Sequence, residues 1–161
     1  MTEAFNHKLS EGDKAPTFKS IDQDGNSISL SDFKGKRVVL YFYPEDDTPT
    51  CTEQACNLRD NYSVLKKEGI VVLGVSPDDA EKHKKFEKKF NLPFTLVVDD
   101  KKKIINKYGV WGPKLMFGNH YMGLLRTTFL IDEKGIIRKI FRKPRSSQHT
   151  EEILQAWAAI K

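Results

Sequence analysis

The chain is 161 residues long, a usual size for one domain, and 39% of its residues are hydrophobic, which is enough for a sizeable core. No apolar run approaches the length of a membrane span, and residues 1–12 are polar and lack the core of a signal peptide. We therefore expect one soluble, cytoplasmic domain over residues 1–161 that does not act at a membrane.

The formal net charge is +5, and most of the excess lysine lies within residues 82–89 and 101–103. A basic balance can indicate nucleic-acid binding. Here the lysines of the first cluster alternate with Phe86 and Phe90 at helical spacing, which is typical of the solvated face of an amphipathic helix. His83 lies among these lysines and is expected on the same solvated face. We therefore expect no nucleic-acid partner.

The chain has two cysteines, too few for a secreted scaffold held by disulfides. In a reducing compartment, a nearby cysteine pair indicates redox chemistry or a metal site. Zinc requires about four ligands at tighter spacing, and the histidines are scattered. We expect redox chemistry without a metal or another cofactor.

The first half of the chain predicts alternating strands and helices. Residues 16–30 indicate two short strands around the turn signal Asp24–Gly25, followed by a single helical turn. A buried strand over 38–43 precedes a helix from about 51 to 67 that ends at Gly69. A buried, parallel strand over 70–76 leads to a helix that starts around residues 76–79 and reaches about residue 90.

The second half predicts a strand at 95–98, a short helix at 101–108 and a long loop at 110–125. Residues 127–132 and 136–143 indicate a hairpin, and residues 150–160 an amphipathic helix that directs Ile153, Leu154 and Trp157 inward. This order of elements indicates an α/β fold with a central mixed sheet flanked by helices and an N-terminal β-hairpin. The active site of such a sheet lies beyond the carboxyl ends of its strands.

The chemistry of the chain is expected at residues 44–56. Pro44 ends the buried strand because it has no N–H for the ladder. Two overlapping signals then mark a helix start: Thr48 before Pro49, and a capping box from Thr50 to Glu53. Either one places Cys51 in the first turn, where free N–H groups and the helix dipole stabilise an anion. A thiolate is such an anion, so we predict a reactive cysteine.

These residues also resemble a known family. Pro44, Thr48 and Cys51 match the peroxidatic motif of peroxiredoxins, and Cys56 matches the resolving position of the subfamily called peroxiredoxin Q or bacterioferritin comigratory protein. Two later blocks, 108–112 and 121–132, resemble the same subfamily, and the resemblance runs from about residue 12 to the C-terminus. Gln54 departs from the pattern, which has glutamate at that position.

The resemblance implies a thioredoxin-like fold and a thiol peroxidase that reduces hydrogen peroxide and organic hydroperoxides to water and alcohols. Cys51 would be the nucleophile, Thr48 would hold the peroxide, and Pro44 would shield the thiolate. Arg126 matches the active-site arginine of the family. Cys56 would close an intramolecular disulfide, and thioredoxin or glutaredoxin would reduce it. The resemblance also implies a monomer.

Two other interpretations of the cysteine pair remain at this point. A general thiol–disulfide oxidoreductase usually carries Cys-x-x-Cys, which the four-residue gap here does not satisfy. A redox sensor or holdase would use the same oxidation to expose a binding surface. The aromatic residues Trp111, Phe117 and Tyr121 are candidates for a substrate or partner groove, or for the core.

The spacing of the cysteines predicts a conformational change. On one regular helix, residues five positions apart are offset by about 7.5 Å along the axis, with side chains about 140° apart. A disulfide usually needs Cα atoms about 4.4–6.8 Å apart and facing side chains. We therefore expect the reduced protein to keep the helix with two free thiols, and disulfide formation to unwind the first turns.

Overall fold

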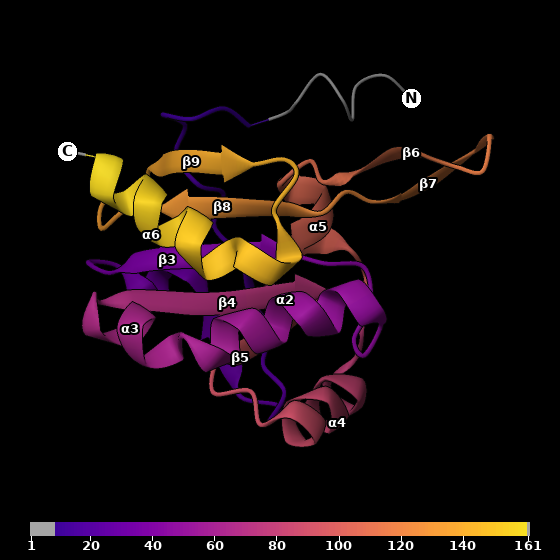
Figure 1. Cartoon of the computed structure of the whole chain (residues 1–161), viewed down its shortest axis with the longest axis horizontal. Coiled ribbons are helices and arrows are strands. Elements are labelled where there is room, and N and C mark those ends of the chain that lie inside the picture. The colour runs from indigo at the N-terminus through magenta and orange to yellow at the C-terminus, as the bar shows by residue number, and fades with distance from the viewer. Residues whose placement is uncertain (1–8, 161) are drawn as a thin grey trace.

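Figure 1 shows the computed structural model, which describes residues 9–160. Residues 1–8, most of the polar start noted above, and residue 161 lie outside the described part. Within residues 9–160, no helix combines the length and the apolar character that crossing a bilayer requires.

A five-stranded mixed sheet in the order β5-β4-β3-β8-β9 forms the centre of the fold. Its strands β3 (Arg37–Phe42), β4 (Ile70–Ser76) and β5 (Thr95–Val98) are parallel. The strands β8 (Thr127–Ile131) and β9 (Ile137–Phe141) form an antiparallel hairpin, and β8 lies antiparallel to β3. The predicted mixed sheet is confirmed, and its central strands are buried because both faces are covered.

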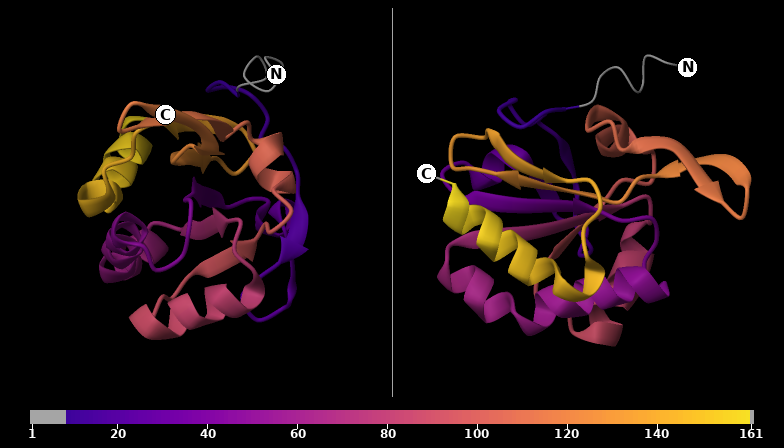
Figure 2. Two further views of the ribbon diagram at one scale, coloured as in Figure 1. Left: turned by 90° about the vertical axis from the view of Figure 1, so that its right-hand side faces the viewer. Right: turned by 45° about the horizontal axis from the view of Figure 1, so that its top comes forward.

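Four helices cover one face of the sheet and pack on the alternate residues of β3 that include Tyr41 (Figure 2). They are α2 (Pro49–Asp60), α3 (Tyr62–Lys67), α4 (Ala80–Phe90) and α6 (His149–Ala159), with the 3₁₀ turn η2 (Ser146–Gln148) just before α6. The other face carries α5 (Lys103–Lys107) and the N-terminal segment, which pack around Leu40 and Phe42.

The N-terminal hairpin is confirmed, with strands β1 (Lys19–Ile21) and β2 (Ser27–Ser29) followed by the 3₁₀ turn η1 (Leu30–Phe33). The Asp22 carboxylate accepts hydrogen bonds from the backbone N–H groups of Asp24 and Asn26, at 2.9 and 3.0 Å. The Asp22 side chain therefore satisfies two backbone N–H groups within its own turn.

α2 begins at Pro49 with Thr48 as N-cap, which confirms the first of the two predicted starts, whereas the capping box from Thr50 to Glu53 is wrong because both residues lie within the helix. Two other helix boundaries differ from the prediction. The single helix expected to about residue 67 is two helices, because Asn61 leaves the helical conformation between α2 and α3. α4 begins only after its N-cap Asp79, whose carboxylate accepts the N–H of Lys82.

The long loop predicted over 110–125 is wrong. The strands β6 (Trp111–Met116) and β7 (Asn119–Leu124) form an antiparallel hairpin that projects from the body (Figures 1 and 2). Glycines and Pro113 interrupt the alternation that normally identifies a strand. Phe117 and Gly118 both have positive φ, at 53° and 80°, and form the turn.

A pH dependence of stability follows from His149, the first residue of α6. Burial lowers the pKa of this imidazole from its ordinary value of 6.5, and the hydrogen bond that the ring makes to the Glu152 carboxylate opposes the shift only in part. The unfolded chain therefore takes up the proton at a higher pH than the folded chain does. We expect stability to fall as pH drops below about 6.5, because the unfolded state then binds more protons.

Urea denaturation at about pH 7 and about pH 5.5 measures this effect, which should shrink in His149→Gln and persist in His120→Gln, whose side chain is exposed. An unchanged pH dependence in His149→Gln would contradict the assignment.

Candidate active site

Cys51 is the third residue of α2 and lies just beyond the carboxyl end of β3. Its side chain is 1% exposed and packs in the core cluster between the sheet and the helices. The first turn of α2 has backbone N–H groups without helical partners, so a negative charge on this sulfur is stabilised. The predicted place of Cys51 in the first turn of a helix is confirmed.

Arg126 lies between β7 and β8, far from Cys51 in the sequence, and its side chain reaches the Cys51 sulfur. Its Nη2 lies 2.9 Å from the Cys51 Sγ, and its Nη1 donates to the Gln54 Oε1 at 3.3 Å. The guanidinium is always charged, so it would attract a negative charge on the sulfur. The sequence anticipated Arg126 only through the family resemblance.

Gln54 is the residue whose role the sequence left undefined. Its side chain is fully buried one turn after Cys51, and its carbonyl oxygen accepts from Arg126. The amide provides the acceptor that orients the guanidinium without adding a second negative charge beside the sulfur.

Thr48 and Pro44 lie on the loop between β3 and α2, and both are half-buried. The Thr48 hydroxyl donates to the Glu45 carbonyl at 3.0 Å, and the Thr48 carbonyl accepts the N–H of Thr52 at 2.8 Å. The hydroxyl keeps its two lone pairs available as acceptors in this arrangement. Thr48 therefore stands at the entrance of the helix, three residues before the thiol.

Cys56 lies on the same helix and is half-buried. Both thiols are free, and α2 is continuous from Pro49 to Asp60. This is the arrangement that the cysteine spacing predicts for the reduced protein.

Tyr41 is a buried polar neighbour that the sequence analysis missed. Within the described residues, its hydroxyl and the Gln54 Nε2 are buried without a hydrogen-bond partner. Burial raises the pKa of Tyr41 well above its ordinary range, and the charges of Asp46 and Cys51 add to the shift. The phenol therefore stays neutral and remains a donor. Its ring fits because the residue opposite on β4 is Gly74, where a Cβ would come within 3.0 Å of it.

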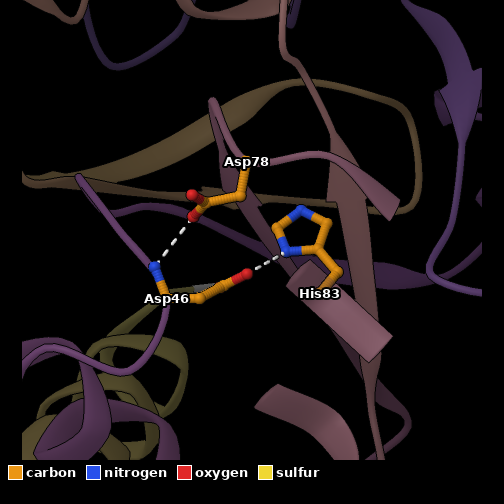
Figure 3. A group of neighbouring side chains, drawn as sticks. All are labelled: Asp46, Asp78 and His83. Carbon is orange, nitrogen blue, oxygen red and sulfur yellow. Dashed lines mark hydrogen bonds and ion pairs between the residues drawn. The ribbon is translucent and has the colours of Figure 1, made fainter. Parts of the chain in front are cut away.

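The acidic run before the helix is bound to α4. Glu45 pairs with Lys82, Asp46 with His83, and Asp47 with Lys89. The expectation that His83 is solvated is wrong, since it is 0% exposed and its ring contacts the Asp46 carboxylate (Figure 3). Lysine neighbours suggested a surface position, and the carboxylate that compensates for burial lies 37 residues away.

The three aromatic residues noted in the sequence do not gather at the thiol. Phe117 is 95% exposed at the tip of the β6–β7 hairpin, and Tyr121 is exposed on β7. Trp111 is half-buried at the base of β6, where the Lys102 ammonium lies 5.0 Å from its ring centroid.

A buried cysteine at a helix N-terminus, faced by an arginine on a thioredoxin-like α/β sheet, defines a class of thiol-dependent redox proteins. Residues 11–140 match the model of the AhpC/TSA family. The chain is 48% identical over 144 residues to Peroxiredoxin Bcp of Bacillus subtilis, covering 89% of this chain and 92% of that protein. It is 47% identical over 146 residues to Peroxiredoxin Bcp of Escherichia coli K12, covering 91% and 94%.

Solved structures that are similar to this one belong to the same group of proteins. The peroxiredoxin Q of Xylella fastidiosa superposes with a TM-score of 0.87 at 28% identity, covering 94% of this chain and 96% of that one. A structure of the bacterioferritin comigratory protein of Xanthomonas campestris, described as having alkyl peroxide reduction activity, superposes at 0.82 with 30% identity, covering 88% and 90%. The chain belongs to the AhpC/TSA family and is a peroxiredoxin, an oxidoreductase that reduces peroxides with a cysteine thiol. The thioredoxin-like fold inferred from the sequence is thereby confirmed.

The Arg126 contact yields a prediction. Arg126→Ala removes a charged hydrogen bond to the sulfur, and such bonds contribute about 1.5–3 kcal/mol, so thiolate-dependent alkylation of Cys51 at neutral pH should slow by about tenfold or more. Alkylation with iodoacetamide, followed by mass spectrometry, measures the rate at each cysteine.

Arg142→Ala is the matched control, because this exposed arginine binds the Leu9 carbonyl instead. An unchanged Cys51 rate in Arg126→Ala would show that the guanidinium does not stabilise the thiolate.

Proposed function

We propose that Cys51 is the peroxidatic cysteine, that Arg126 and Thr48 position the peroxide, and that Cys56 resolves the oxidised thiol. The observation that carries this proposal is the 2.9 Å contact between the Arg126 Nη2 and the Cys51 Sγ at the start of α2. The buried Gln54 also holds the Arg126 guanidinium in place. Such orientation has no purpose for a surface arginine, but it is needed in an arginine that binds a thiolate and an attacking peroxide.

In the first step, the Cys51 thiolate attacks one peroxide oxygen. An S–O bond forms, and the O–O bond breaks with its electron pair leaving on the second oxygen, which takes up a proton as water or an alcohol. Cys51 becomes a sulfenic acid. Negative charge moves from sulfur to the leaving oxygen, and the Arg126 guanidinium can follow it with its several N–H donors. Thr48 would bind the peroxide through its hydroxyl, and Pro44 would limit the access of water.

In the second step, the Cys56 thiol attacks the sulfur of the sulfenic acid. The S–S bond forms, the S–O bond breaks, and water leaves. α2 must unwind locally for this step, because its intact form separates the two side chains. A thioredoxin-type dithiol then donates two electrons by thiol–disulfide exchange and restores both thiols. We propose hydrogen peroxide and organic hydroperoxides as substrates, supported by the alkyl peroxide reduction of the Xanthomonas relative.

We further propose a monomer, formed by residues 1–161 as one domain, that works in the cytoplasm. Two free thiols that must be recycled suit a reducing compartment. Thioredoxin and glutaredoxin both remain candidates for the reductant.

Cys51→Ser should abolish peroxide consumption, because a serine hydroxyl is not ionised near neutral pH and is a much weaker nucleophile. Peroxide consumption coupled to a thioredoxin system measures it, with circular dichroism to confirm the fold. Substantial remaining turnover in this variant would refute the assignment of Cys51.

Cys56→Ser should keep the first oxidation and lose the disulfide. Stopped-flow measurements should then show one fast phase, and dimedone should trap the sulfenic acid on Cys51. If the fast phase were lost as well, Cys56 would act in the first step and not only in resolution.

A further inference from the structure

Two polar contacts, one buried and one partly buried, lie on either side of the segment that must unwind. We propose that the Asp46–His83 contact and the Asn57–Thr150 contact are latches that fix the two ends of segment 47–56, so that oxidation displaces Cys51 while Cys56 stays in place. The inference rests on the proposed roles of the two cysteines, and it assigns positioning roles to Asp46, His83, Asn57 and Thr150.

The N-terminal latch joins the side chains of Asp46 and His83 (Figure 3). The side chains of Asp46 and His83 are both 0% exposed, and the His83 Nδ1 lies 2.6 Å from the Asp46 Oδ2. The His83 Nε2 lies 2.9 Å from the Val97 carbonyl on β5 and must carry a hydrogen to bond it. The Tyr43 hydroxyl donates to the other Asp46 oxygen. The loop before α2 is thus bound to α4 and to the sheet at once.

Asp78 adds a backbone contact to this latch. Its Oδ2 accepts the N–H of Asp46 at 2.8 Å and the hydroxyl of Ser76 at 2.7 Å. The ligand atoms of Asp46, Asp78 and His83 lie within 4.8 Å of one another, as in a metal site. The Asp46 and His83 atoms already bind each other, the Asp78 Oδ2 already accepts two hydrogen bonds, and the Lys82 ammonium lies 3.1 Å from the Asp78 Oδ1, so the cluster is better explained as a latch.

The latch is stronger than its exposed neighbour. Removing one partner of a buried polar contact leaves the other without water or a replacement, whereas an exposed pair is screened by solvent and contributes little. Asp47 and Lys89 form such an exposed pair, with side chains 43% and 59% exposed. The chain can therefore leave α4 at Asp47 while Asp46 remains bound.

The C-terminal latch joins α2 to the start of α6, which lie side by side in Figures 1 and 2. The Asn57 Oδ1 accepts the N–H and the hydroxyl of Thr150, both at 2.8 Å. The Asn57 Nδ2 donates to the Ser147 carbonyl at 2.9 Å. Thr150 is 2% exposed and Asn57 is half-buried, so the two bonds between them are partly shielded from water.

The two cysteines lie at different distances from the C-terminal latch, so they can move to different extents when the helix opens. Cys51 lies five residues after Asp46 and six before Asn57, the middle of the segment. Five extended residues span at most about 17 Å, which gives Cys51 ample reach once the helix opens. Cys56 directly precedes Asn57 and is held near its starting place, so the reactive sulfur moves to the resolving sulfur.

Hydrogen exchange by NMR on the unmodified protein tests the proposal, because two amides report on the latches themselves. The Asp46 N–H binds Asp78, and the Thr150 N–H binds Asn57. Both should keep their protection in the disulfide form, while the amides of residues 52–56 lose theirs relative to the reduced form. Loss of protection at Asp46 or Thr150 on oxidation would overturn the proposal.

Single substitutions distinguish the two latches, because each latch is expected to affect a different step of the reaction. His83→Gln keeps an amide donor for the Val97 carbonyl but loses the Asp46 contact, so the first oxidation should slow by about tenfold while disulfide closure is retained. Asn57→Ala should leave the first oxidation unchanged and slow closure by about tenfold, with more sulfenic acid trapped by dimedone.

Lys89→Met is the control, since it removes only the exposed tie between the loop and α4 and should change neither rate. Asp46→Asn should retain most of the native first rate, because the new side chain keeps an oxygen that accepts from Tyr43 and gains an amide donor toward the His83 Nδ1. Equal slowing of both steps in His83→Gln and Asn57→Ala, or no effect in either, would show that these contacts serve stability alone.

If the proposed function itself were wrong, the unmodified protein would not form the Cys51–Cys56 disulfide with peroxide. That result is distinct from a disulfide form in which the latch amides have lost protection.

Discussion

The contact between the buried Cys51 sulfur and the Arg126 guanidinium is the interaction on which the candidate site depends. Cys51 is almost fully removed from water, so a negative charge on its sulfur would have to be stabilised by the protein itself. Two groups are placed to do this, the N-terminus of α2 and the Arg126 guanidinium. These groups meet because β3 and β8 are antiparallel neighbours in register, with Phe42 opposite Thr127. The end of one strand and the beginning of the other therefore lie at the same edge of the sheet.

The intact helix α2 separates the two cysteines too far for a disulfide. Under the proposed function, its first turn has to be ordered for peroxide attack and then open for resolution, so its contacts need different strengths along its length. The first turns contact Arg126 through Cys51 and Gln54, and the next residues bind α6 through Asn57. Segments that serve such a function come from the low-stability end of a fold, while the strands beneath them stay intact.

Charge is arranged locally rather than as one basic surface. The acidic residues 45–47 pair with cations of α4, which fixes the loop that carries Thr48. Only one of these pairs is enclosed, and enclosure is what turns an ion pair from a weak surface contact into a strong constraint. Two lysines of α4 therefore bind acidic residues close to the candidate site. The spacing of the lysines alone does not show this role.

The sequence by itself determined the features that depend on neighbours in the chain. Apolar runs identified the buried strands, Pro44 ended β3, and the cap signals placed Cys51 at a helix start. The spacing of Cys51 and Cys56 established that one intact helix cannot hold their disulfide. The family motif added Arg126, whose own neighbours carry no signal for its role.

Only the tertiary structure decided the features whose partners lie far away in the chain. It buried His83 against Asp46, joined Gln54 to Arg126 and Asn57 to Thr150, and formed the hairpin β6–β7 where glycines obscure the strand pattern. It also interrupted the second helix at Asn61. Local signals reflect the conformation of a few adjacent residues, whereas burial and hydrogen bonding depend on which segments the sheet brings together.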